Sequence, residues 1–226
     1  MIETKFDIFM PAGGLGRRLG AISKKKPKPL IKISNREFIL YVIDSLLKVN
    51  IGTLNLLISY KSNQFKKLKL PDIKTNFFID KKRNGTFNCL YLIKHKINKH
   101  FIYSNSDEIL DVELNTIIKK FNKYKPDVLQ LYFLDKNGIQ LNKKDVINTK
   151  KFNKKENYTE AGLKIFNKNI FKFKIEISYK KIEDFITDNK NKINIKIFII
   201  DKKPYSIDSS SRITRTKKYL SNYIKF

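Results

Sequence analysis

The chain has 226 residues, 41% of them hydrophobic, a single cysteine, and 48 Lys and Arg against 21 Asp and Glu, which gives a net charge of +27. This length suits one domain with a sheet covered on both faces, whereas the chain has no apolar run that could span a bilayer and no cysteine pair for an internal disulfide. The excess charge is mostly lysine spread along the chain, without a helix-turn-helix, zinc knuckle or RNA-binding aromatic motif, so we interpret it as solvated surface and expect no specific nucleic-acid partner.

Apolar runs and amphipathic segments alternate along the first 134 residues. The apolar runs predict strands at residues 6–10, 53–59, 75–79, 101–104 and 128–134. Segments with helical periodicity predict helices at residues 37–49, 62–69, 87–96 and 112–124. Because the strands lack an in/out pattern, both faces of the sheet must be covered, which predicts an α/β fold: a three-layer Rossmann-like α/β/α sandwich with a mostly parallel central sheet.

The regular alternation of apolar runs and amphipathic segments ends at about residue 135. Residues 138–152 are polar and predict either a strand-rich excursion or a flap. Further strands are expected at residues 160–166 and 193–200, and further helices at residues 182–189 and 213–223. Because there is no Pro/Gly/Ser-rich linker and no internal repeat, we interpret residues 1–226 as a single domain.

A glycine-rich loop follows the first strand and reads PAGGLGRRLGAISKKKPKPL over residues 11–30. Gly13, Gly14 and Gly16 leave room for backbone N–H groups to close on phosphate oxygens, and Arg18 and Lys28 add positive charge. The loop is neither a G-x-G-x-x-G dinucleotide loop nor a P-loop, which would need Gly-Lys-Ser/Thr. It is therefore predicted to bind a polyphosphate.

This string resembles the opening signature of the sugar-nucleotide pyrophosphorylases, or sugar-1-phosphate nucleotidyltransferases, roughly G-G-x-G-T-R-L followed by P-K-P-L. The resemblance implies that a nucleoside triphosphate and a sugar 1-phosphate, or another phosphomonoester, give an activated phosphoester and pyrophosphate. It assigns Arg18 to the β- and γ-phosphates and Lys28 to the α-phosphate. It also implies a nucleotide-binding half over about residues 1–110 and an acceptor-binding half over about residues 111–226.

Two aspartates match the positions at which this family holds a divalent metal. Asp107 follows a predicted strand, where the family carries N-G-D, and Asp208 ends a late strand, where the family has an aspartate before a G-T turn. Carboxylate oxygens suit Mg²⁺. The resemblance therefore implies Mg²⁺ as cofactor with both aspartates as ligands, although Ser106 and Ser210 replace the family's glycines.

Three further positions match family motifs around the substrates. Gly85 and Thr86 match a G-T loop that approaches the base and sugar of the nucleotide, and Gly162 matches an N-A-G strand whose glycine lets a sugar approach the backbone. Glu160 replaces the asparagine of that motif. The family's E-K-P segment, whose lysine holds the sugar phosphate, has no full counterpart. The nearest lysines are Lys150 and Lys151.

The substrates stay open at this point. The small size and the V-E-L after the first metal aspartate resemble the heptose-1-phosphate guanylyltransferases of surface-polysaccharide pathways, whereas FNCLYL resembles a segment of phosphocholine-type cytidylyltransferases. The two serines leave open a nucleotidyltransferase-like protein without catalysis, and the net charge leaves open a polyanion-binding module. Residues 1–7 lack the apolar core of a signal peptide, so we expect a cytoplasmic protein, and a homo-oligomer stays open.

Overall fold

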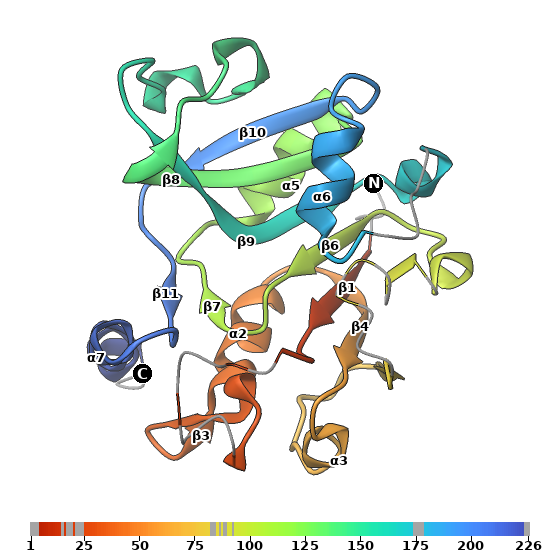
Figure 1. Cartoon of the computed structure of the whole chain (residues 1–226), viewed down its shortest axis with the longest axis vertical. Helices are drawn as coiled ribbons and strands as arrows, with labels where there is room; N and C mark the ends of the chain where they lie inside the picture. Colours follow the sequence, from red (N-terminus) through yellow and green to blue (C-terminus); the bar gives the residue numbers. More distant parts are fainter. Residues whose placement is uncertain are drawn as a thin grey trace.

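A seven-stranded sheet with the order β10-β8-β9-β6-β1-β4-β5 runs through the molecule (Figure 1). The computed structural model describes residues 5–14, 16, 20, 25–81, 85, 87, 90–91, 93–173 and 179–223. Its strands are β1 (Phe6–Pro11), β4 (Ile51–Ile58), β5 (Thr75–Ile79), β6 (Phe101–Ser104), β8 (Val128–Ile139), β9 (Tyr158–Phe166) and β10 (Ile195–Ile200). Among these strands only β9 runs antiparallel to its neighbours, so the sheet is mostly parallel, as predicted.

Helices cover both faces of this sheet. The described helices are α2 (Phe38–Leu46), α3 (Ser62–Phe65), α5 (Leu114–Tyr124), α6 (Ile182–Asp188) and α7 (Ser210–Tyr223). In Figure 1, α6 lies in front of the sheet and α5 behind it. None of the described helices is both long and apolar enough to cross a membrane.

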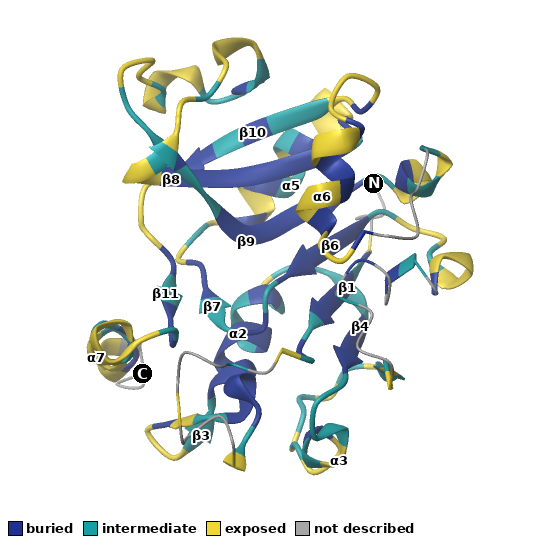
Figure 2. Cartoon of the chain, viewed as in Figure 1, coloured by how far each residue is buried: buried dark blue, intermediate teal, exposed yellow. Residues whose placement is uncertain are grey.

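The apolar runs in the sequence arise because each central strand packs into two cores. On β1, Ile8 and Met10 enter a core shared with α2 and α5, whereas Phe9 packs into a second core shared with Phe185 of α6. Figure 2 shows the central strands as buried along most of their length. Alternate side chains are apolar on both faces, which confirms the three-layer α/β/α sandwich.

Residues 138–152 form a flap rather than a strand-rich excursion. Strand β8 continues to Ile139, and two 3₁₀ turns follow it, η4 (Lys143–Asp145) and η5 (Thr149–Lys151). Gly138 is needed because a Cβ there would lie 2.2 Å from the carbonyl oxygen of Tyr158. The strand therefore runs further than predicted because its polar end still pairs with β9.

Two short antiparallel pairs are not predicted by the sequence pattern. Strand β2 (Lys32–Ile33) pairs with β3 (Arg36–Glu37), and β7 (Glu108–Ile109) pairs with β11 (Tyr205–Ser206). Two-residue strands carry too few side chains to show a period of two. The helix expected at residues 87–96 falls partly outside the described residues, and its described end is the 3₁₀ turn η3 (Lys94–Lys96).

Candidate active site

The β7–β11 pair joins the two segments that carry the predicted metal ligands. Glu108 lies opposite Ser206, which brings the preceding Asp107 and the following Asp208 to the same place. Ser106, 3% exposed, donates a 2.6 Å hydrogen bond to the carbonyl of Pro11 at the end of β1. The aspartates are thereby tied to the start of the glycine loop, at the carboxyl edge of the parallel strands where such folds bind ligands.

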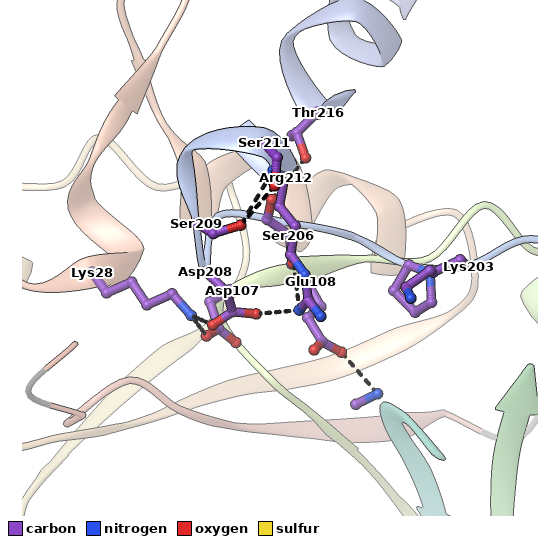
Figure 3. A network of polar contacts seen from close by, with 12 residues as sticks. Lys28, Asp107, Glu108, Lys203, Ser206, Asp208, Ser209, Ser211, Arg212 and Thr216 are labelled. Carbon is purple, nitrogen blue, oxygen red and sulfur yellow. Dashed lines mark hydrogen bonds and ion pairs between the residues drawn. The ribbon is translucent and has the colours of Figure 1, made fainter. Parts of the chain in front are cut away.

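Lys28 lies between these two aspartates (Figure 3). It sits in the 3₁₀ turn η2 (Lys28–Leu30), and its side chain is 11% exposed. Its Nζ donates to Oδ2 of Asp107 and to Oδ1 of Asp208. The structure thus brings together three of the residues that the sequence predicts for catalysis and metal binding, from positions far apart in the chain.

The charges of this group support one another. Burial disfavours the charged form of Lys28, but Asp107 and Asp208 outweigh it and hold the pKa of the ammonium above its usual value. Burial likewise disfavours ionised Asp208, but hydrogen bonds and nearby cations, Lys28 first among them, hold its pKa below the usual range. At neutral pH the group therefore contains a charged Lys28 ammonium beside the ionised carboxylate of Asp208.

A cation that the sequence analysis missed also contacts Asp208. Arg212 in the first turn of α7 donates from Nη1 to Oδ2 of Asp208 at 2.8 Å, while Lys28 contacts Oδ1. Arg212 follows Asp208 by four residues, a spacing at which two side chains can meet on one face of a helix. This spacing was the signal in the sequence that could have identified Arg212. The helix was expected only from residue 213, so this signal was overlooked.

The donor set at this point suits Mg²⁺. Two carboxylates converge on one cationic group, and hard oxygen ligands are the ones that this ion prefers. Among the described residues there is no cluster of three or more His, Cys, Asp or Glu side chains that could hold a metal. Mg²⁺ commonly binds through one or two carboxylates together with substrate phosphates, so two aspartates are sufficient.

Glu108, which the sequence analysis did not single out, connects this group to Gly162. Its Oε2 accepts the backbone N–H of Gly162 at 2.9 Å, and the N–H of Asn105 donates to the Gly162 carbonyl at 2.7 Å. A Cβ at Gly162 would lie 2.3 Å from Nδ2 of Asn105. Side chains of the chain itself therefore occupy the space beside Gly162, and its approach to a sugar stays a prediction.

Replacing Glu108 with Gln should flatten the pH dependence of folding stability. Burial and the nearby Asp107 raise the Glu108 pKa from 4.5 to about 7. Between these values the unfolded chain releases the proton and the folded chain keeps it, so stability falls as the pH rises through this window. We expect Glu108→Gln to be more stable than wild type at pH 8 by on the order of 1 to 2 kcal/mol, with little gain at pH 4. Urea unfolding of both proteins across this range would measure it, and parallel pH profiles would contradict the expectation.

The glycines of the loop differ in what surrounds them. A Cβ at Gly13 would lie 2.7 Å from Cβ of Ser59, whereas a Cβ at exposed Gly14 would meet no atom of the described residues within 4 Å. Gly16 has a left-handed φ of 61°. The fold therefore requires glycine at position 13 for packing and at position 16 for its backbone, whereas the described part of the chain leaves open space at position 14.

Alanine substitutions at positions 13 and 14 should separate folding from binding. Gly13→Ala should lower the free energy of unfolding by about 1 to 3 kcal/mol through overpacking. Gly14→Ala should change it by less than about 0.5 kcal/mol, yet weaken triphosphate binding at least about tenfold, because a small displacement of phosphates is costly. Thermal unfolding and calorimetric titration with GTP would check both. Unchanged nucleotide affinity in Gly14→Ala would contradict the loop assignment.

The remaining predicted site residues are only partly described. Arg18 and Thr86 lie outside the described residues. Gly85 has a left-handed φ of 98°, and a Cβ there would lie 2.3 Å from the carbonyl oxygen of Lys180, so the fold itself requires glycine there. The roles of all three toward a nucleotide stay predictions.

The two candidate sugar-phosphate lysines lie on the flap. Lys151 forms an ion pair with Asp201 at 2.5 Å, beside a cavity of about 340 Å³ that is also lined by Asp111 and Glu113. Lys150 lines a separate, more open cavity of about 800 Å³ on the flap. The structure describes no contact of either lysine with Asp107 or Asp208, so it does not bring them together with the candidate site.

A buried lysine on β9 is a third feature that sequence reasoning missed. The Lys164 side chain is 2% exposed and forms ion pairs with Glu160 on the same strand and with Glu183 on α6, the latter at 2.7 Å. Gln130 donates to Glu160 at 3.3 Å, and burial together with Glu160 raises the pKa of Tyr132 to about 12. This ionic cluster lies along the strand that carries Gly162.

Comparisons with known proteins show what the chain is similar to in sequence and in fold. A family profile described as nucleotidyl transferase matches residues 9–140. D-glycero-alpha-D-manno-heptose 1-phosphate guanylyltransferase from Campylobacter jejuni is 27% identical over 203 residues, 87% of this chain and 90% of that protein. Choline-phosphate cytidylyltransferase from Streptococcus pneumoniae is 28% identical over 127 residues, 54% of this chain and 56% of that protein. The crystal structure of HddC from Yersinia pseudotuberculosis has a similar fold, with a TM-score of 0.79 at 20% identity over 95% of this chain and 99% of that one.

Proposed function

Because the chain belongs to the nucleotidyl transferase family, we propose that it transfers a nucleotidyl group from a nucleoside triphosphate to a sugar 1-phosphate and releases pyrophosphate. The observation that carries the proposal is the convergence of Lys28, Asp107 and Asp208 beside the glycine loop. The first two of these residues fall within the matched family region. Ser106, next to Asp107, is hydrogen-bonded to Pro11 at the start of the glycine loop, which supports a shared role for the loop and this group.

The reaction is a substitution at the α-phosphorus. An oxygen of the sugar phosphate attacks the α-phosphorus, the bond to the bridging oxygen of the β-phosphate breaks, and pyrophosphate leaves with that electron pair. Such transfers depend on positioning and charge neutralisation more than on covalent help from the protein. We assign to the loop backbone the orientation of the triphosphate, and to Lys28 the donation of N–H groups to the α-phosphate as negative charge grows there.

The two carboxylates of the candidate site are proposed to bind the Mg²⁺ cofactor. Asp107 and Asp208 would hold Mg²⁺, which when bound neutralises phosphate charge and draws the reacting groups together. The Lys28 ammonium contacts both carboxylates and has three N–H groups. It can therefore donate to the two aspartates and to an incoming phosphate. These roles are parts of the proposal.

For the substrates we propose GTP and a heptose 1-phosphate, and with them a place in surface-polysaccharide biosynthesis in the cytoplasm. Support comes from the Campylobacter jejuni guanylyltransferase, because the alignment spans 87% of this chain and 90% of the relative. The choline-phosphate cytidylyltransferase aligns with only 54% of the chain, so phosphocholine is the second acceptor to test. A homo-oligomer stays a prediction.

The test is pyrophosphate release with magnesium. GTP, CTP, UTP, dTTP and ATP would each be paired with heptose, mannose and glucose 1-phosphates and with phosphocholine. We expect the largest kcat/KM for GTP with D-glycero-α-D-manno-heptose 1-phosphate. A larger kcat/KM for CTP with phosphocholine would show that the acceptor is phosphocholine and not a sugar 1-phosphate. No pyrophosphate release with any pair would contradict the proposed reaction.

A further inference from the structure

We propose that Arg212 binds the phosphate group of the acceptor substrate, an inference that rests on the proposed nucleotidyl transfer. Arg212 belongs to the first turn of α7, directly after the loop that carries Asp208. Its guanidinium lies at the candidate site, where it contacts Asp208 and Ser206. The following observations distinguish it from an ordinary surface arginine.

Arg212 and Lys28 contact Asp208 through different oxygens and from opposite sides (Figure 3). Nη1 of Arg212 lies 2.8 Å from Oδ2 of Asp208, while Nζ of Lys28 contacts Oδ1. The same Nη1 lies 3.4 Å from Oγ of Ser206, its only other described partner. The two cations therefore flank one carboxylate, and the space beside Asp208 has positive charge on both sides.

Their exposure differs in a way that separates their roles. The Lys28 side chain is 11% exposed and closed in by two carboxylates, whereas that of Arg212 is 45% exposed. A guanidinium has five N–H donors in a fixed fork that matches two phosphate oxygens, and the described hydrogen bonds of the Arg212 guanidinium use a single nitrogen, Nη1. Arg212 can therefore keep its contact with Asp208 and still offer the rest of the fork to an anion arriving from solvent.

The acceptor needs a cation of this kind. A phosphomonoester dianion must approach a triphosphate and two carboxylates, and like charges repel it. Neither flap lysine has a described contact with the candidate site, and Lys151 is paired with Asp201. Within the described part of the chain, Arg212 is the solvent-exposed cation that contacts a carboxylate of the candidate site.

The position of Arg212 favours the acceptor phosphate over the nucleotide. Lys28 comes from the glycine-rich loop of residues 11–30, so it belongs to the nucleotide side of the site. Arg212 comes from the C-terminal helix and lies on the other side of Asp208. In a transfer in which the attacking and leaving oxygens are in line, the acceptor enters opposite the leaving pyrophosphate. An acceptor that binds beside Arg212 would satisfy this requirement.

The experiment compares Arg212→Gln and Arg212→Lys with wild type, using GTP and heptose 1-phosphate. Loss of one charge-assisted contact should raise the KM for the sugar phosphate about 10- to 100-fold and leave the KM for GTP within about twofold. Arg212→Lys should recover part of this loss because it keeps the charge but not the fork. The matched control is Arg36→Gln, since Arg36 forms a 2.6 Å pair with Asp44 that is similarly exposed.

Calorimetric titration of heptose 1-phosphate into wild type and Arg212→Gln provides a second readout that does not depend on turnover. We expect the acceptor affinity to fall by the same factor as the KM rises. An unchanged acceptor KM, or a rise confined to the KM for GTP, would overturn the assignment. If wild type released no pyrophosphate, the proposed function would fail, whereas equal calorimetric affinity of both proteins for heptose 1-phosphate would separately overturn the role of Arg212.

Discussion

Replacing Lys28 by methionine should lower the turnover number for pyrophosphate release by about 10³-fold or more. The ammonium is the buried cation between Asp107 and Asp208, and an equally long apolar side chain cannot donate to an α-phosphate. Removing a single fixed donor to developing charge typically costs about 10² to 10³ in kcat, and a cationic group can cost more. Steady-state assays at saturating substrates would measure the loss.

The fold should survive this substitution. Asp107 and Asp208 keep side chains that are 26% and 19% exposed, so water still reaches both carboxylates once the ammonium is gone. We expect the free energy of unfolding to fall by about 1 to 3 kcal/mol, through the carboxylates left without their partner. Lys32→Met is the control, because Lys32 is 52% exposed and pairs with Glu37 at 3.6 Å. Turnover in Lys28→Met within tenfold of the control would refute the role of this lysine.

Replacing Lys164 by methionine should give the largest loss of stability. Lys164 is 2% exposed and holds Glu160 and Glu183, and burial raises the Glu160 pKa although Lys164 acts against this effect. Removing Lys164 leaves the Glu160 and Glu183 carboxylates without their shared cation, and breaking a buried ion pair in this way typically costs about 3 to 5 kcal/mol. Urea unfolding at pH 7 would measure the change.

A double substitution distinguishes an uncompensated charge from lost packing. Glu160→Gln combined with Lys164→Met removes both buried charges, so much of the stability should return. The matched control is Lys202→Met, since Lys202 is 61% exposed and solvent screens its 2.6 Å pair with Asp111. A Lys164→Met protein as stable as this control would contradict the account of the cluster.

Local patterns were sufficient to predict the sandwich. Strands that pack on both faces must be apolar throughout, and the runs at residues 6–10 and 101–104 therefore predicted β1 and β6 closely. The two-residue strands β7 and β11 carry no such pattern, yet they bring Asp107 and Asp208 together. Their pairing is a tertiary contact between distant segments, and only the motif resemblance indicated that these aspartates belong to one site.

The roles of other charged residues could not be predicted because their burial and their partners depend on segments far away in the chain. In YTEAGLKIF, Lys164 looks like an outward-facing residue of a strand, but α6 covers that face and supplies Glu183. From the sequence, Glu108 looks like a second carboxylate in a turn, but in the structure it accepts the backbone N–H of Gly162 on β9. Residue type alone does not tell whether a charged side chain will be buried against a partner.

The most direct measurement is ³¹P NMR of the protein with magnesium, GTP and D-glycero-α-D-manno-heptose 1-phosphate. The proposed reaction predicts that signals of pyrophosphate and of a nucleotide-sugar diphosphate grow in equal amounts with wild type. With Asp107→Asn, which replaces a proposed Mg²⁺ ligand with a neutral amide, this growth should be at least about 10²-fold slower. Formation of GDP and inorganic phosphate instead, or equal rates in both proteins, would contradict nucleotidyl transfer at this site.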